Sequence, residues 1–398
     1  METMECYFDN SATTRVGENV IKTVTKVMTE DFGNPSSKHA KGVQSEVYLK
    51  DARQVLAKIL KVKEKEILFT SGGTESNNMA LIGTALANER AGRHIITTSI
   101  EHPSVLEPLR SLAERRAEPF EITYLPVDAK GHVSLSDLKD AIREDTILVS
   151  IMMVNNEIGA VQDIASIGKV IKEKNPKTLF HVDAIQAFGK LEILPNKMGI
   201  DLMSVSSHKF HGPKGVGFLY IREGTKIKPL IYGGGQQKGM RSGTDNVPGI
   251  AGMAVAAAES YAAREENVRH MISLKDLLTE ELEKIAQEEQ GKSFSIRINS
   301  QKGELSAPHI LSATFAPIKS EVLLHALEER GIYVSSGSAC SSNKPGVSRT
   351  LESIGLSAKE ADCTIRFSFC KDNTAGEVLY AAEQLRELLP ILSKFISR

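Results

Sequence analysis

Lys209 is the residue whose position most needs a chemical explanation. It lies in "DLMSVSSHKFHGPKGVG", where an apolar run predicts a buried strand that ends in Ser-Ser-His-Lys before a Gly-Pro turn. An ammonium group therefore stands where the strand stops. Partial burial at such a place lowers the basicity of a lysine amine, which is what an imine-forming catalyst requires. A surface lysine at a strand end is the plainer alternative.

Polar residues also follow four other predicted strands. The full set is Ser71-Gly72-Gly73-Thr74 after the first strand, Glu101-His102 after the second, Asn155-Asn156-Glu157 after the third, Asp183 and Gln186 at the fourth, and Ser206, His208 and Lys209 at the fifth. Ligands of an open parallel sheet bind beyond the carboxyl ends of its strands. Contact with water would explain one polar strand end, but five together indicate a site.

The residue types at these strand ends suggest one cofactor. The segment "TSGGTES" is a Gly-rich turn that opens a helix and favours a phosphate, although it matches neither the dinucleotide nor the P-loop spacing. Asp183 ends an apolar strand and needs a cationic partner there, unless it only caps or forms a salt bridge. His102 either transfers protons or packs. Together with the Lys209 amine, these groups describe pyridoxal phosphate held as a Schiff base.

The cysteines and histidines give weaker signals. His208 and His211 have no cysteine or acidic residue at ligand spacing, so we expect no metal site. The four cysteines contain no C-x-x-C pair and suit a reducing compartment. We expect Cys6 and Cys363 to be small buried hydrophobic residues. Cys340 differs, because its surroundings "SSGSACSSNKPG" predict an exposed loop and so suggest a chemical role for its thiol.

Short β-branched runs alternate with segments of helical period and would position these groups. "EILFT", "HIITTSI" and "TILVSIMMV" each precede such a segment. This alternation predicts an α/β fold with a mostly parallel sheet and helices on both faces. We expect a large domain over residues 15–260 and a smaller α+β domain formed by residues 1–14 and 261–398.

The bulk composition excludes several classes of partner. Lys plus Arg number 49 and Asp plus Glu number 50, a formal charge of −1, without long runs of like charge. Bulk charge therefore favours neither direct nucleic-acid binding nor a membrane surface. The N-terminus lacks the pattern of a targeting segment, and no apolar run approaches the ~18 residues that a bilayer requires. These features predict a soluble, cytoplasmic protein.

Nearly the whole chain resembles the cysteine desulfurases, in the class V branch of the aminotransferase fold. The motifs that carry this resemblance occur in the family's order: "YFDNSATT", "FGNPSSKHAKG", "FTSGGTESNN", "EHPSV", "VNNEIGAVQDI", "HVDAIQAFGK", "SSHKFHGPKGVG", "GGGQQKGMRSGT" and "SSGSAC". The resemblance implies a fold-type I transferase that depends on pyridoxal 5'-phosphate, with a sheet of the seven-stranded type.

The resemblance also implies a role for each matching residue. Around the cofactor ring, Lys209 binds the aldehyde, Asp183 pairs with the pyridinium nitrogen, His102 stacks on the ring and assists proton transfer, and Gln186 contacts the ring hydroxyl. The phosphate is held by Gly73, Thr74, Ser206 and His208, joined by Thr244 from a second subunit. The substrate carboxylate is bound by Asn156 and Arg366. A homodimer follows from the role of Thr244.

By the same resemblance, L-cysteine becomes L-alanine and Cys340 receives the sulfur as a persulfide. The segment after "SSGSAC" reads "SSNKPGVSRTLESIG", which departs from the familiar desulfurases of iron-sulfur assembly. The acceptor could therefore be an iron-sulfur scaffold, a tRNA-thiolating enzyme or another sulfur acceptor. A class V aminotransferase or a selenocysteine lyase would keep Lys209 and Asp183, but neither would depend on Cys340.

Overall fold

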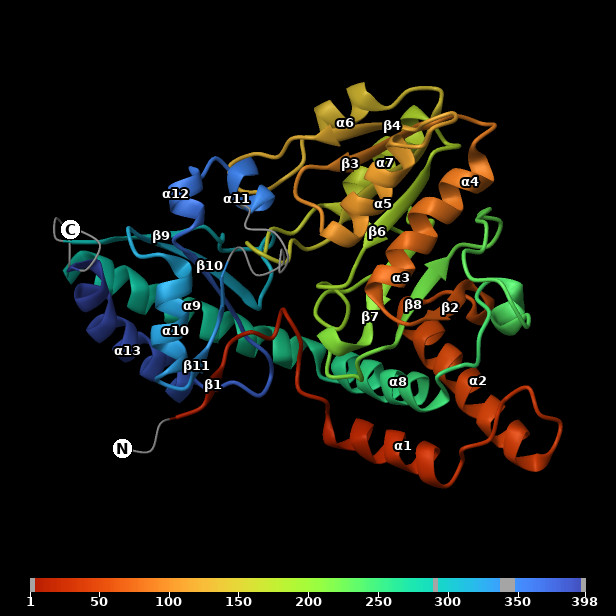
Figure 1. Cartoon of the computed structure of the whole chain (residues 1–398), viewed down its shortest axis with the longest axis horizontal. Coiled ribbons are helices and arrows are strands. Elements are labelled where there is room, and N and C mark those ends of the chain that lie inside the picture. The colour runs from red at the N-terminus through yellow and green to blue at the C-terminus, as the bar shows by residue number, and fades with distance from the viewer. Residues whose placement is uncertain (1–3, 289–292, 337–347, 395–398) are drawn as a thin grey trace.

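The largest element of the chain is a seven-stranded sheet in the order β2-β8-β7-β6-β5-β3-β4 (Figure 1). The computed structural model describes residues 4–288, 293–336 and 348–394. The strands of this sheet are β2 (Ile67–Thr70), β3 (His94–Thr98), β4 (Glu121–Leu125), β5 (Thr146–Met152), β6 (Leu179–Asp183), β7 (Leu202–Ser206) and β8 (Gly217–Ile221). Only β8 runs against its neighbours, so the prediction of a mostly parallel sheet is confirmed.

Helices cover both faces of this sheet, because successive side chains of each buried strand point to opposite sides. In β3, Ile96 packs into the core on one face and Ile95 into the core on the other. The first core contains residues of α1 (Glu18–Thr29), α2 (Ala40–Leu60), α6 (Leu135–Ala141), α7 (Ile164–Lys174) and α8 (Val247–Ala262). The second contains residues of the π-helical turn η2 (Met79–Gly83), α4 (Thr84–Asn88) and α5 (Pro103–Ala113), and α3 (Gly73–Asn78) leads into η2.

The shared direction of five strands brings their carboxyl ends to one edge of the sheet. β3, β5, β6 and β7 run parallel to one another. β2 points the same way, because both β2 and β7 are antiparallel to β8. Gly217, the first residue of β8, pairs there with Thr70 and with Ser206. The five polar strand ends found in the sequence therefore lie along one rim.

A separate core, called the smaller core below, joins the start of the chain to its C-terminal part. It includes Cys6 and Phe8 together with buried residues from Met271 to Leu389. Its sheet is antiparallel, in the order β12 (Ser335–Ser336), β13 (Thr364–Ser368), β10 (Ile310–Ala316) and β9 (Ser295–Ile298), and β1 (Cys6–Tyr7) pairs with β11 (Ile332–Tyr333).

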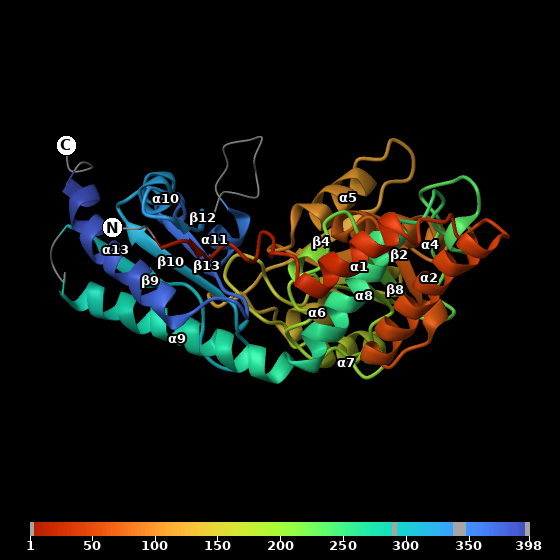
Figure 2. The same cartoon turned by 90° about the horizontal axis from the view of Figure 1, so that it is seen from below.

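Long helices flank this smaller sheet. Figure 2 shows α9 (Arg264–Glu288) running along it beside α13 (Ala375–Lys394). The remaining elements are α10 (Ser320–Glu328), α11 (Arg349–Ser353), α12 (Ala358–Ala361) and the short turns η1 (Glu64–Glu66), η3 (Ser207–Lys209) and η4 (Gln236–Gly239). In the described part of the chain, no helix combines the length and the apolar character that crossing a bilayer demands.

An aromatic cluster lies directly beneath the segment that carries Lys209. The ring of Phe188 is fully buried, and its centroid lies 4.9 Å from that of Phe210, 5.4 Å from that of Phe218 and 5.1 Å from that of Tyr261. Edge-to-face and tilted contacts of this kind add to the stabilisation from burial alone. Phe188 therefore supports the turn next to Lys209.

We predict that Phe188→Ala lowers the free energy of unfolding by about 3–5 kcal/mol, because a cavity replaces a ring with three aromatic neighbours. Denaturant unfolding followed by circular dichroism would measure this. Leu135→Ala, at a half-exposed apolar position, is the matched control and should change stability by less than about 0.5 kcal/mol. Equal losses in the two variants would contradict the role of the cluster.

Candidate active site

A cavity of about 370 Å³ opens at the rim of the large sheet, beside the turn between β2 and α3. It is lined by Ala12, Thr13, Ser71, Gly72, Gly73, Thr74, Glu75, Ser206, His208, Lys214 and Gly215. Gly72 has φ +146°, and a Cβ on Gly73 would lie 2.2 Å from Cδ1 of Ile185. Gly72 therefore suits a φ that residues with side chains rarely adopt, and a side chain at Gly73 would require Ile185 to move. Of the predicted phosphate ligands, Gly73, Thr74, Ser206 and His208 line this cavity.

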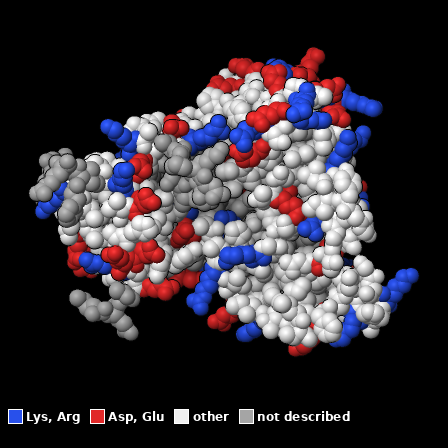
Figure 3. Space-filling view, in the orientation of Figure 1, with Lys and Arg blue, Asp and Glu red and all other residues white. Residues whose placement is uncertain are grey.

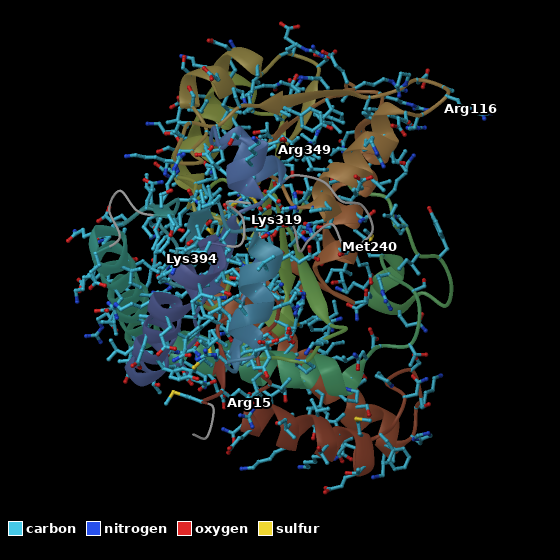
Figure 4. All side chains as sticks on the ribbon, turned by 60° about the vertical axis from the view of Figure 1, so that its left-hand side comes forward. Arg15, Arg116, Met240, Lys319, Arg349 and Lys394 are labelled. Atoms are coloured by element: carbon cyan, nitrogen blue, oxygen red, sulfur yellow. The ribbon has the colours of Figure 1, made fainter. Side chains whose placement is uncertain are left out.

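The amine of Lys209 is held by the N-terminal segment. Its Nζ donates to the carbonyl oxygen of Ser11 at 2.6 Å and to that of Ala12 at 2.7 Å. Arg15, labelled in Figure 4, follows this segment where the chain approaches α1. Sequence reasoning found Lys209 but missed its two acceptors, because backbone carbonyls have no residue-type signal.

Asp183 and His102 face the same buried region. Asp183 accepts from the Asn77 side chain at 2.9 Å and from the Ile185 N–H at 3.0 Å. Burial raises the pKa of Asp183, while these two donors and the nearby charges of His102 and Lys209 act in the opposite direction. Burial lowers the pKa of His102, so its ring tends to be neutral.

Gln186 connects the two halves of the molecule. Its Nε2 donates to the Ser11 carbonyl at 2.9 Å, and its Oε1 lies 3.2 Å from Nε2 of His309. Because an amide oxygen can only accept, His309 must carry its proton on Nε2. His309 stands immediately before β10 of the smaller sheet, so the predicted cofactor ligand Gln186 touches both cores.

Arg366, on β13, reaches the site from the smaller sheet. Its guanidinium donates to Asp9 Oδ1 at 2.8 Å and to the carbonyl oxygen of Asn156 at 2.8 Å. The Arg366 side chain is buried, and its Nε has no hydrogen-bond partner among the described residues. The two predicted carboxylate ligands, Asn156 and Arg366, are thus in contact, and a buried donor remains available.

Two predicted residues are not brought into this cluster. Thr244 is exposed on the loop between η4 and α8 and is not among the residues that line the cavity. Cys340 lies outside the described residues.

His208 hydrogen-bonds Thr13 Oγ1 at 3.2 Å, and burial together with the charge of Lys209 lowers its pKa to about 4. The His208 ring is therefore neutral at ordinary pH.

The remaining cysteines and His211 lie behind Lys209 or in the smaller core. Cys6 and Cys363 are buried, as predicted. The sequence gave His211 no acidic or thiol neighbours, but the fold places it near Cys370 and Asp372, with ligand atoms within 4.8 Å of one another. The Lys371 amine contacts Asp372 at 2.6 Å, and a cation at that position opposes a bound metal ion.

The sequence assigned no role to two buried residues near Asp183, although Glu101 belongs to the predicted set of polar strand ends. Glu101 accepts from Thr98 Oγ1 at 2.7 Å and from the Met152 N–H at 2.9 Å, and burial raises its pKa to about 8. Its neutral form spares Asp183 a second negative charge at neutral pH. Asn77 sits within the "TESNN" run, and only its place on the buried face of α3 distinguishes it from the neighbouring Asn78.

The comparisons with known proteins agree on one family. The model of the family described as Aminotransferase class-V matches residues 6–380. A cysteine desulfurase IscS from Methanosarcina thermophila is 44% identical over 98% of this chain and 93% of its own length. A cysteine desulfurase IscS from Dictyoglomus turgidum is 41% identical over 97% of this chain and 94% of its own.

Solved structures give the same result. One described as a NifS-like protein has a TM-score of 0.90 and 41% identity, covering 98% of this chain and 100% of its own. A second, described as SspA in complex with cysteine, has a TM-score of 0.77 and 35% identity, covering 93% of this chain and 100% of its own.

We predict that Asp9→Asn lowers the free energy of unfolding by about 3 kcal/mol, because the buried guanidinium of Arg366 loses the carboxylate that neutralises it. Denaturant unfolding would measure the loss. Asp9→Asn combined with Arg366→Met should recover most of it, since no buried charge is then left unpaired. If the double variant is less stable than Asp9→Asn alone, the ion pair is not the source of the effect.

Proposed function

Since this chain belongs to the class V aminotransferase family and is a cysteine desulfurase, we propose that pyridoxal 5'-phosphate on Lys209 is its cofactor and that Cys340 receives the sulfur. The observation that carries this proposal is the convergence of Lys209, Asp183 and the Gly73 turn at one sheet edge. In the overall reaction, the C–S bond of L-cysteine breaks, an S–S bond to Cys340 forms, and the former β-carbon takes a proton to give L-alanine.

The described residues fit this cofactor. The cavity beside Gly73 has room for a phosphate and is lined by Thr74, Ser206 and His208. Asp183 is a buried carboxylate that two donors already favour in its charged form, as a pyridinium partner requires. Bound pyridoxal phosphate would supply an electron sink for the α-carbon of the amino acid. Gln186 would contact its ring hydroxyl.

Each protein group then has a task of its own. The carbonyl oxygens of Ser11 and Ala12 hold the Lys209 amine whenever it is free, which keeps it beside the reacting centre. His102 stacks on the ring and, being neutral, adds no positive charge beside the pyridinium. Arg366 offers its unpaired buried Nε to the substrate carboxylate, with Asn156 adjacent.

Cys340 is proposed as the sulfur acceptor on the enzyme because of its Gly- and Ser-rich surroundings in the sequence. The final acceptor is an iron-sulfur scaffold, a tRNA-thiolating enzyme or another sulfur acceptor, because "SSNKPGVSRTLESIG" departs from the familiar desulfurases of iron-sulfur assembly. The cytoplasmic location expected from the cysteine pattern is likewise a proposal.

We predict that Cys340→Ala abolishes alanine formation from L-cysteine in the presence of a reductant, because no thiolate remains to take the sulfur. Chromatographic measurement of alanine tests this. Cys363→Ala, which changes a buried thiol, is the matched control and should keep nearly full activity. Cys340→Ala should still bind pyridoxal phosphate, as seen in its visible absorbance. Full alanine production by Cys340→Ala would contradict Cys340 as the sulfur acceptor, and no alanine from either protein would point to an aminotransferase or a selenocysteine lyase.

We also propose a homodimer in which Thr244 reaches the partner's phosphate site. Large apolar side chains are exposed near that loop and on α2 and its approach, including Phe32 (67%), Val43 (52%) and Tyr232 (77%). Figure 3 shows a broad face with few charged side chains over α1 and α2. Met240, labelled in Figure 4, anchors the same loop by packing against the core that contains η2.

A cavity of about 1070 Å³ lies between α2 and residues 221–245, and Asp245, the neighbour of Thr244, is among the residues that line it. We expect the partner subunit to cover the exposed apolar side chains Phe32, Val43 and Tyr232, because monomeric proteins rarely expose large apolar patches.

We predict that Val43→Glu combined with Tyr232→Glu converts a dimer into monomers, because the partner surface would have to bury two carboxylates. Sedimentation velocity at micromolar concentration would measure the change. Leu379→Glu, at an exposed apolar position on α13, is the control and should stay dimeric. A monomeric wild type at the same concentration would contradict the dimer.

A further inference from the structure

Asn77 is fully buried. It contacts Asp183 directly and is linked to His102 through Ser104, and both Asp183 and His102 are proposed to contact the cofactor ring. Its Nδ2 lies 2.9 Å from Asp183 Oδ2 and 2.8 Å from Ser104 Oγ. An amide nitrogen has two N–H groups, so both are in use. The carboxylate fixes the orientation of the amide, because a flipped Asn77 would present its oxygen to Asp183. Its Oδ1 is buried and lacks a hydrogen-bond partner within the described ranges.

Ser104 passes this arrangement on to His102. Because its Oγ accepts from Asn77, its hydroxyl proton is directed to His102 Nδ1, at 2.8 Å. The Ser104 backbone N–H also donates to Nδ1, at 3.1 Å. Nδ1 is therefore the acceptor, and the neutral imidazole carries its proton on Nε2. The hydrogen bonds from Asn77 to Ser104 and from Ser104 to His102 therefore all donate in the direction of the His102 ring.

We propose that Asn77 is a positioning residue that holds Asp183 as a carboxylate and, through Ser104, sets which nitrogen of His102 is protonated. This inference rests on the proposed cofactor. Nothing in the proposed reaction requires Asn77 to touch substrate or cofactor. Its effect is exerted through Asp183, which loses one of its two donors if the amide is removed.

Other charged groups also face Asp183 and must stay constant in a test. These are Glu101 after β3, His102 at the start of α5 and Lys209 in η3. Burial raises the pKa of Glu101 to about 8, and this carboxyl accepts from Thr98 Oγ1 and the Met152 N–H, not from Asn77. The phosphate and Lys209 are the same in every variant. A difference between variants in the pH dependence of cofactor affinity therefore reports on Asp183 and on its neighbour His102, the two groups that Asn77 reaches.

The test is the affinity of the full-length, cofactor-depleted protein for pyridoxal 5'-phosphate, titrated by absorbance from pH 5 to pH 9. Affinity should fall as acid protonates Asp183, whose charged form the pyridinium needs. In Asn77→Ala the carboxylate loses a donor, its pKa rises further, and the acidic fall should start about one pH unit higher. Asn77→Leu, which fills the space without a donor, should show the same displacement.

The matched control is Asn78→Ala, one residue along α3. The Asn78 Nδ2 donates to the Thr74 carbonyl at 2.8 Å and is not bonded to Asp183. It should leave the acidic fall where the wild type has it. A pH-independent loss of affinity in both Asn77 variants, or recovery in Asn77→Leu alone, would mean that Asn77 only fills space and would overturn the inference.

A second measurement tests, without any cofactor, the part of the proposal that concerns the tautomer of His102. Nitrogen-15 spectra of the ligand-free protein should show the Nε2–H tautomer of His102, and an Nδ1–H pattern would overturn this part of the proposal. The proposed function fails differently, because a wild type that binds no pyridoxal phosphate would remove both proposals. Normal binding with an unmoved acidic fall would remove the role of Asn77 alone.

Discussion

The placement of two cationic side chains at the junction of two cores, the buried Arg366 and the partly buried Lys209, constrains the rest of the structure. Lys209 comes from the large sheet and Arg366 from the small one, and residues 9–12 supply acceptors to both. A short segment can serve both cations only if it is fixed at each end. Cys6 and Phe8 anchor it in the smaller core, while Thr14 bonds the His208 carbonyl next to Lys209.

Burial at this junction sets the protonation states that the chemistry needs. A buried group is charged only where donors or opposite charges favour that form. His102 and His208 are therefore neutral, and Glu101 holds its proton up to about pH 8. Burial also raises the pKa of Asp183, but its two donors, Asn77 and the Ile185 N–H, and the nearby charge of Lys209 oppose that rise. Glu101 likewise accepts two hydrogen bonds, so the charge of Lys209, and not the number of donors, distinguishes the two carboxylates.

Sequence patterns could predict whatever depends on periodicity and on strand ends. The five polar strand ends were visible because a parallel sheet must place them on one rim, and Lys209 and Asp183 are indeed found there. β4 was not anticipated, because it is a largely exposed edge strand without a clear apolar pattern. The pairing of Asp9 with Arg366 depends on how two cores meet, and a separation of 357 residues leaves no local trace of it.

The described thiols also bear on where the sulfur can go. A thiolate is the attacking form of cysteine, and burial suppresses it. Burial raises the pKa of Cys6 to about 12 and that of Cys370 to about 11, and it also raises the pKa of Cys363. At neutral pH a thiol of pKa 11 is ionised in only about one molecule in ten thousand. The three buried cysteines among the described residues are therefore poor nucleophiles, which supports the proposal that Cys340 carries the persulfide.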